Sequence, residues 1–363
     1  MEPRLDEPRV LAPYVRVGFQ DGTLFLGFGS IRRPVHDRAL WESLLRLADH
    51  FRTPRTRAEA RSFLDGPCGV DVDRAEAVMR LLEDGNHLIP AHTYDPADRY
   101  SRHTLFYALS GADAVKVQLR LARSRVVLLG CGGIGSLVAV TLATAGVGEL
   151  VLVDADQVEP SNLTRQFLFT EADIGRPKAE VLARELRRRN HDCRARPVVH
   201  EVGDGEDLEH LPACDLLVVS ADSPGLTGMV NAHCVRSGTP WLNACYVNDI
   251  AVWGPLVVPG TTGCWDCRPF TAHAPEGEPE LAGLMARIND RYQAPSNGPV
   301  NMLASSLAVL DVLRYLGGFG TPSSLNRRVG VWSHDLTLDE QGAERDPACP
   351  TCADAVPLCE GVR

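Results

Sequence analysis

Residues 126–135 read VVLLGCGGIG, and the chain continues as SLVAVTLATAG to residue 146. This order predicts a buried strand that turns through glycines into a helix. The next apolar run, ELVLVD, ends at Asp154, 19 residues after Gly135. Glycines let backbone N–H groups approach a phosphate at a helix N-terminus, and the carboxylate can hold ribose hydroxyls. The layout predicts a nucleotide-binding unit, although a nicotinamide or flavin enzyme fits the glycines alone equally well. The glycines concerned are Gly130, Gly132, Gly133 and Gly135.

Outward from this stretch, short apolar runs alternate with helical patterns. The runs include ELVLVD, DLLVVSAD (215–222) and AVWGPLVV (251–258). Near-continuous apolar strands separated by helices are typical of a parallel sheet that is buried on both faces. We therefore expect an α/β fold with a doubly wound, mainly parallel sheet. A buried helix is expected at 300–315, and a long loop at 273–283 that continues to 299 and covers the site.

The first 92 residues have a different pattern. Residues 14–28 alternate around Asp21-Gly22, which predicts a hairpin, and helical patterns follow at about 38–52, 56–65 and 72–86. This order predicts a winged-helix-like α+β module. A polar, proline-containing linker at 92–98 places the domain boundary, giving domains 1–92 and 93–363.

Composition excludes several classes of protein. The net charge is -10, from 37 Lys and Arg against 47 Asp and Glu, so no basic face for nucleic acid or anionic membranes is expected. The first residues, MEPRLDEPRV, lack a signal-peptide core, and no apolar run was found to reach the length of a membrane span. The 11 cysteines then favour metal ligands or thiols over disulfides. We expect a cytoplasmic protein.

Two basic residues after Asp154 point away from a dehydrogenase. Arg165 lies in VDADQVEPSNLTRQ, and Lys178 ends GRPK, 13 residues later. A guanidinium and an ammonium suit the oxygens of a triphosphate. Asp222 ends another strand and could hold Mg²⁺ on those phosphates at the same sheet edge. The plainer alternatives are a surface ion pair for Arg165 and a helix cap for Asp222.

Four cysteines form two C-x₂-C pairs, Cys264/Cys267 and Cys349/Cys352. Four thiolates in such pairs make a closed, tetrahedral Zn²⁺ site of the structural kind. A redox motif is the alternative for either pair alone.

Together these motifs, with RYSRH at 99–103, resemble the E1-like adenylating enzymes in their bacterial ThiF/MoeB form, over about residues 98–355. The resemblance implies that Asp154 holds the ribose of ATP and that Asp222 coordinates Mg²⁺. It also implies that Arg102 reaches the phosphates of a partner's ATP across a homodimer interface. Further ATP contacts are expected from Asp156, Asn162, Arg165, Gln166 and Lys178, and catalytic roles from Arg102, Arg165, Lys178 and Asp222.

The N-terminal module resembles the PqqD-like leader-recognition domains of peptide-modifying enzymes. Such a domain binds an extended peptide as an added strand. Here the groove is expected between residues 24–33 and the helix at 72–86. A dimerisation or packing module is the alternative.

The combination resembles peptide-maturing E1-like enzymes of the microcin C and pantocin types. We expect ATP-dependent adenylation of a carboxyl or amide group on a ribosomally made precursor peptide. One alternative is a sulfur-carrier adenylyltransferase, which the absence of a cysteine between Cys267 and Cys349 weighs against. Cys245 is the remaining candidate nucleophile, with a buried structural thiol as its alternative. Another alternative is a non-catalytic leader-binding scaffold for a cyclodehydratase, which tends to lack intact nucleotide residues.

Overall fold

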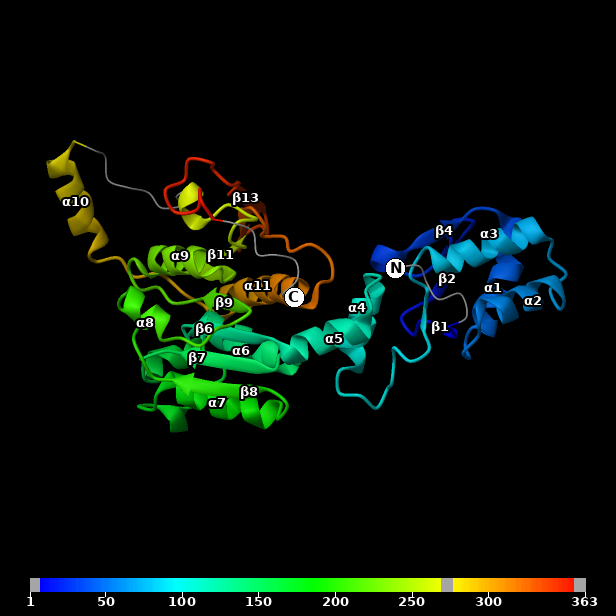
Figure 1. The fold of residues 1–363 in the computed structure, drawn as a ribbon, viewed down its shortest axis with the longest axis horizontal. Coiled ribbons are helices and arrows are strands. Elements are labelled where there is room, and N and C mark those ends of the chain that lie inside the picture. The colour runs from blue at the N-terminus through cyan, green and yellow to red at the C-terminus, as the bar shows by residue number, and fades with distance from the viewer. Residues whose placement is uncertain (1–6, 269–276, 356–363) are drawn as a thin grey trace. The chain divides into compact units, whose positions relative to one another are not determined.

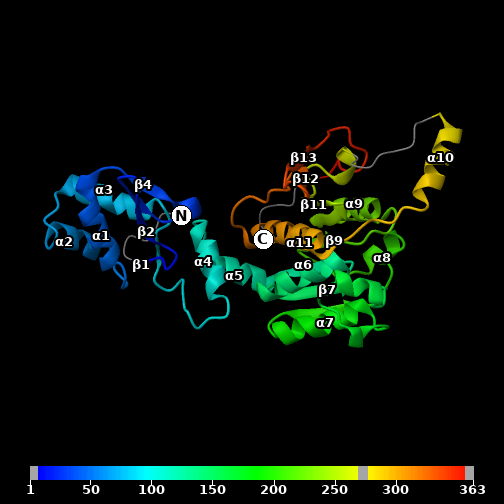
Figure 2. The same ribbon diagram turned by 180° about the vertical axis from the view of Figure 1, so that it is seen from behind.

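A computed structural model describes residues 7–268 and 277–355, and the chain divides into two compact units, Met1–Leu119 and Arg120–Arg363 (Figures 1 and 2). The second unit holds an eight-stranded sheet in the order β13-β12-β11-β10-β9-β6-β7-β8. Its strands are β6 (Arg125–Leu129), β7 (Glu149–Val153), β8 (Arg194–Val198), β9 (Leu216–Val219), β10 (Trp241–Val247), β11 (Ile250–Val257), β12 (Arg327–Trp332) and β13 (Leu338–Gly342).

The sheet is parallel from β10 through β9, β6 and β7 to β8, and antiparallel from β10 to β13. Connections from β6 run outward to β8, and the chain then returns to β9 on the other side of β6. Right-handed crossovers place helices on opposite faces in such an order. The expected α/β class with a mainly parallel, doubly wound sheet is confirmed.

The helices of this unit follow the predicted alternation. They are α6 (Gly133–Thr144), α7 (Lys178–Arg189), α8 (Gly205–Glu209), α9 (Leu226–Ser237), α10 (Pro279–Asn289) and α11 (Gly298–Gly317), while α5 (Ala114–Arg123) spans the division between the units. The helix expected at 300–315 is confirmed as part of α11. The loop expected at 273–283 is wrong from Pro279 onward, because α10 begins there. Residues 273–276 lie outside the described residues.

By length and composition, α11 is a candidate membrane span among the described helices, contrary to the expectation that no run is long enough. The contacts of α11 indicate a core helix instead, because it packs against α6, β10 and β11. Residues along it, including Val300, Ala304, Ala308 and Val312, are buried. This is the pattern of a core helix that is covered on several sides.

The first unit contains a three-stranded sheet, β2 (Val17–Gln20), β3 (Thr23–Leu26) and β4 (Arg33–Val35), and a small pair, β1 (Arg9–Leu11) with β5 (Leu88–Pro90). Asp21 and Gly22 both adopt positive φ, of 50° and 76°, so the hairpin turn is confirmed. The three expected helices are α1 (Trp41–His50), α2 (Arg57–Asp65) and α3 (Val72–Glu83), followed by α4 (Ser101–Leu109). Leucines of β3 and α1–α3 form the core of this unit.

The topology corrects one part of the expected peptide groove. β3 pairs with β2 on one side and with β4 on the other. Residues 24–26 are therefore in the middle of the sheet and cannot accept another strand. The edges are β2 and β4, and β4 carries Pro34, a residue that sheets accept at edges.

A buried carboxylate ties the end of α11 to the sheet. Asp311 accepts hydrogen bonds from the backbone N–H groups of Ser323, at 2.7 Å, and Ser324, at 2.8 Å. The indole N–H of Trp253 on β11 donates to it at 3.1 Å, and Arg314 pairs with it at 3.2 Å. Since Asp311 has no exposed surface, these donors replace its lost hydration.

We expect Asp311→Ala to lower the free energy of unfolding by about 3–5 kcal/mol, because it leaves buried donors without an acceptor. Urea unfolding followed by tryptophan fluorescence measures the change. Asp339→Ala, at an exposed position of β13, is the control and should change stability by less than about 0.5 kcal/mol. A loss below about 1 kcal/mol for Asp311→Ala would contradict this role.

Candidate functional site

The glycine-rich loop crosses from β6 to α6 in a conformation that needs glycine. Gly130 has a φ of +95°, and a Cβ there would lie 2.8 Å from backbone atoms of Ser220 and Ala221. A Cβ on Gly135 would overlap the carbonyl of Gly130. The cap of α6 is Gly132, with no side chain bonded to the first N–H groups of the helix. Those N–H groups and the helix dipole form a site suited to a phosphate.

Asp154 follows β7 directly and holds the glycine loop. Its Oδ2 accepts the N–H of Cys131 at 2.6 Å, and its Oδ1 accepts the N–H of Asp156 at 2.8 Å. Burial raises the pKa of Asp154, although those two N–H groups act in the opposite direction. The carboxylate therefore links the end of β7 to the phosphate loop, where a ribose would lie in this type of fold.

Asp156 and Lys178 are brought together as expected for residues of one site. The Lys178 ammonium, at the start of α7, lies 2.7 Å from Oδ2 of Asp156. Only 8% of the lysine side chain is exposed, against 71% for the aspartate. The ammonium is thus held near the loop by a carboxylate that water still reaches.

The segment between them carries the other polar candidates. Asn162 is buried and accepts the N–H of Glu159 at 3.1 Å, which fixes the 3₁₀ turn Pro160–Thr164. Arg165, half-buried, donates to the carbonyl of Ser161 at 2.9 Å. Within residues 7–268 and 277–355, the buried amide oxygen of Gln166 has no hydrogen-bond partner, so it can accept a donor from a ligand. The amide nitrogen of Gln166 lies near the Gly132 position of the loop.

Asp222 lies at the same edge of the sheet. Val219 of β9 is paired in register with Leu129 of β6, and Ser220 donates to the carbonyl of Leu129 at 2.8 Å. The carboxyl ends of the two strands therefore meet, and the exposed Asp222 follows within a few residues.

Arg102 lies on α4 in the first unit, where its side chain is exposed. Its expected role across a dimer stays a prediction.

One site residue was missed by sequence reasoning. Asn301, buried in the first turn of α11, has its amide against Gly133, where a Cβ would collide with it. The same amide exchanges hydrogen bonds with Ser296, at 3.3–3.4 Å. No local pattern indicates this contact, because the two residues are far apart in the sequence.

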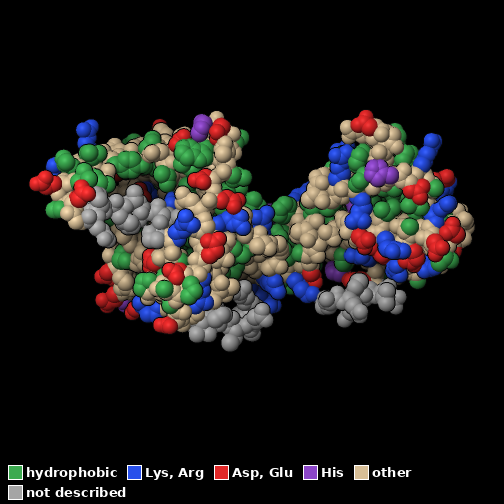
Figure 3. All heavy atoms as spheres, turned by 90° about the horizontal axis from the view of Figure 1, so that it is seen from above, with side chains coloured by type: hydrophobic (Ala, Val, Ile, Leu, Met, Phe, Trp, Pro, Cys, Tyr) green, Lys and Arg blue, Asp and Glu red, His purple; other side chains and the backbone are tan. Residues whose placement is uncertain are grey.

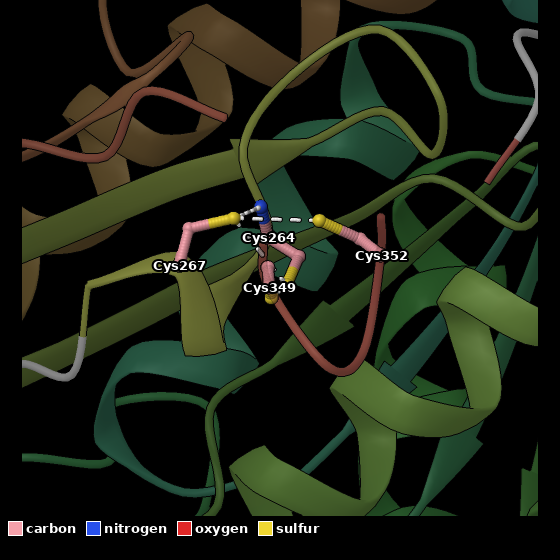
Figure 4. A group of neighbouring side chains, drawn as sticks. All are labelled: Cys264, Cys267, Cys349 and Cys352. Carbon is pink, nitrogen blue, oxygen red and sulfur yellow. Dashed lines mark hydrogen bonds between the residues drawn. The ribbon is translucent and has the colours of Figure 1, made fainter. Parts of the chain in front are cut away.

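The four predicted metal ligands converge from two distant segments (Figure 4). Their sulfur atoms all lie within 4.8 Å of one another, with Cys264 to Cys349 at 3.6 Å and Cys267 to Cys352 at 3.3 Å. Tetrahedral Zn²⁺ with Zn–S bonds of about 2.3 Å needs sulfurs about 3.8 Å apart. Burial raises the pKa of Cys264 to about 11, so a cation would have to displace its proton. The donor set and spacing fit a metal ion.

Cys245 lies on β10, half-buried. Its sulfur is 3.6 Å from the amide nitrogen of Asn243 and 3.8 Å from the guanidinium of Arg328 on β12. Both neighbours are hydrogen-bond donors, which a buried structural thiol also accepts. These contacts leave both interpretations of Cys245 open.

Comparison with solved structures gives a match over nearly the whole chain. The structure of E. coli MccB with MccA-N7isoAsn is 38% identical, with a TM-score of 0.89, and covers 96% of this chain and 100% of that chain. The microcin C7 biosynthetic enzyme MccB in complex with N-formylated MccA is 39% identical, with the same TM-score, and covers 95% of this chain and 99% of the other.

Sequence relatives match a shorter part. The sulfur carrier protein ThiS adenylyltransferase of E. coli (strain K12) is 34% identical over 261 residues, which covers 70% of this chain and 94% of the relative. The family model for ThiF matches residues 100–351. The chain therefore belongs to the ThiF family and is an E1-like, ATP-dependent adenylyltransferase.

Proposed function

We propose that this enzyme adenylates a carboxyl or amide group of a ribosomally synthesised precursor peptide, producing acyl-AMP and pyrophosphate. The observation that carries the proposal is the extent of the match. The ThiS adenylyltransferase of E. coli has 94% of its length matched within 70% of this chain. MccB matches 96% of this chain, so its likeness includes the first unit.

The solved MccB structures indicate the chemical class of substrate. They contain the peptide MccA, an N-formylated form of MccA, a succinimide, or ATP. A peptide and ATP are the two reactants that the proposed reaction needs. A succinimide is a cyclised product of a side-chain or terminal carbonyl, which supports activation of such a group.

The proposed reaction joins two anions. A carboxylate oxygen attacks the α-phosphorus of ATP, the bond to the β-phosphate breaks, and pyrophosphate leaves. Lys178 and Arg165 neutralise the triphosphate, and Asp222 would hold Mg²⁺, which would supply further positive charge at the phosphates. Asp154 holds the ribose, and the N-terminal N–H groups of α6 bind phosphate oxygens. Asn162, Gln166 and Asp156 position these groups.

In this proposal the N-terminal module, residues 1–92, binds the precursor peptide at a free edge of its three-stranded sheet, β2 or β4. On the surface in Figure 3, acidic and basic side chains are interspersed over this module. A mixed surface does not favour nucleic acid as the partner. The enzyme acts as a homodimer in the cytoplasm, with Arg102 reaching the partner's ATP.

For the four-cysteine cluster we propose structural Zn²⁺. Four thiolates fill a tetrahedral coordination sphere and leave no position for a substrate. The ion would join the segments around Cys264 and Cys349, which are far apart in the sequence and are brought together by folding. The ion then contributes to the folded structure and takes no direct part in bond making or breaking.

Two other functions make different predictions. A sulfur-carrier adenylyltransferase, favoured by the ThiS relatives, takes a small protein as substrate in place of the peptide. A leader-binding scaffold binds peptide without consuming ATP. The intact Asp154, Lys178 and Asp222 support a working enzyme over the scaffold.

We expect pyrophosphate release from Mg·ATP to require an added short peptide, and synthetic MccA, the peptide of the MccB structures, is the probe. Lys178→Ala and Asp222→Asn should each lower the rate by about 10²–10³-fold, since each removes charge stabilisation at the phosphates. A coupled pyrophosphate assay measures the rate, and mass spectrometry of the peptide shows addition of AMP or loss of water.

Lys116→Ala is the matched control, because Lys116 is the other lysine of the chain and pairs with Asp113 on an exposed surface. It should keep the wild-type rate. Tight peptide binding without pyrophosphate would favour the scaffold, and release that depends on a sulfur-carrier protein would favour the ThiS-type activity.

Zinc analysis gives a separate prediction. The purified protein should hold about one Zn²⁺ per chain, and Cys264→Ser should lose it and lower Tm by several degrees. Elemental analysis and thermal unfolding measure both. Cys193→Ser, at a buried cysteine outside the cluster, should retain the metal. A metal-free wild-type protein with unchanged Tm in chelator would refute the zinc assignment.

A further inference from the structure

We infer that Asn231 is a positioning residue that joins the four-cysteine cluster to the loop carrying Asp222, so that metal binding orders the Mg·ATP site. The inference rests in its second half on the proposed function. Asn231 lies on α9, has no exposed surface, and belongs to neither motif that the sequence revealed.

Both the nitrogen and the oxygen of the Asn231 amide make their hydrogen bonds with the segment of the first cysteine pair. Its nitrogen donates to the sulfur of Cys264 at 3.5 Å and to Oδ2 of Asp266 at 3.0 Å. Its oxygen accepts the N–H of Trp265 at 3.1 Å. One side chain thus holds three successive residues of the C-W-D-C segment.

Asp266 extends this contact to the second cysteine pair. The same Oδ2 that accepts from Asn231 also accepts the hydroxyl of Thr351 at 2.6 Å. Asp266 stands between Cys264 and Cys267, and Thr351 stands between Cys349 and Cys352. The chain Asn231–Asp266–Thr351 therefore links α9 to both metal-binding segments. Partners of this kind orient metal ligands and typically change metal affinity by about 10–100-fold when removed.

The N-terminal end of α9 connects Asn231 to the loop that carries Asp222. The loop between β9 and α9 contains Asp222 and closes at Gly225, whose φ of +80° is the left-handed cap of the helix. Leu226 and Val230 of α9 pack in one core with Cys264, Cys349 and Cys352. Among the described residues, no side-chain hydrogen bond of Asp222 occurs. Its position is thus set by the strand before it and by α9 after it.

An amide is required at position 231 because both a donor and an acceptor are used. Alanine removes the donor that Asn231 gives to the half-buried Asp266 carboxylate and the acceptor that it gives to the Trp265 N–H. Aspartate keeps the acceptor but places a second carboxylate beside Asp266 and removes the donor to the sulfur. Both variants should weaken the hydrogen bonding that orients Cys264, and Asn231→Asp should weaken it more than Asn231→Ala.

The first test measures zinc release into a chromogenic chelator from the full chain, without ATP or peptide. We expect Asn231→Ala to accelerate release by about tenfold or more and Thr351→Val by less, because Thr351→Val keeps the contact to Cys264. Asn190→Ala is the matched control: Asn190 is also buried and donates its amide to the carbonyl of Ala143, at 2.6 Å, away from the cluster. Its release rate should equal the wild-type rate. Equal rates for Asn231→Ala and Asn190→Ala would overturn the inference at the metal.

The second test measures ATP affinity by calorimetry with and without Mg²⁺. We expect Thr351→Val and Asn231→Ala to weaken binding in the presence of Mg²⁺ and to leave Mg²⁺-free binding at the wild-type level. Unchanged Mg·ATP affinity would overturn the link to Asp222. Because neither test uses the peptide, a failure of the proposed peptide activity would show separately, in the pyrophosphate assay. If Asn231→Ala does not fold, Thr351→Val, at a half-buried position, carries both tests.

Discussion

The contact between Gly130 and the backbone of Ser220 and Ala221 is the constraint on which the site depends. A Cβ at residue 130 would lie 2.8 Å from those backbone atoms. The N–H of Gly130 donates to Val153, and the N–H of Ser220 donates to Leu129, so the ends of β6, β7 and β9 are tied together there. Asp154, the first turn of α6 and Asp222 all start from these three ends. A side chain at 130 would separate the strands and move all three groups at once.

A second constraint joins two segments of the unit that are far apart in the sequence. The cysteine pairs lie 85 residues apart, and between them the chain forms α10, α11, β12 and β13. Bringing the ends of so long a loop together costs conformational entropy, and this cost grows slowly with loop length. A metal ion bound to both pairs therefore reduces the conformational freedom of the unfolded chain and also links the two segments in the folded chain. The buried Asp311 performs a similar task with hydrogen bonds, because it holds the end of α11 against β11.

The sequence allowed the chemistry-bearing residues to be predicted where they follow strands. Gly130, Asp154 and Asp222 could be placed because parallel strands put their carboxyl ends at one edge. The four cysteines could be placed because their spacing is specific. Asn231 and Asn301 could not, since each lies within a helix and contacts residues that are far away in the sequence. The acidic, Pro-rich stretch 273–283 predicts a loop, but Pro279 stands at the start of α10, where a helix accepts proline. Leu281, Leu284 and Ile288 of that helix remain exposed. The central place of β3 depends on strand pairing, which local alternation does not specify.

The chain also constrains what can follow the adenylate. An acyl-AMP must be captured by a nucleophile, and enzymes that transfer the group to a carrier place a cysteine for this purpose. No cysteine occurs between Cys267 and Cys349, and those two cysteines are directed into the four-sulfur cluster. On the proposed function, a nucleophile of the peptide itself is then the alternative to Cys245. A nitrogen a few bonds from the activated carbonyl has an effective concentration that no free amine in solution reaches. Capture by the peptide's own backbone needs no thiol from the protein, and it would form a cyclic imide, the chemical class of the succinimide in an MccB structure.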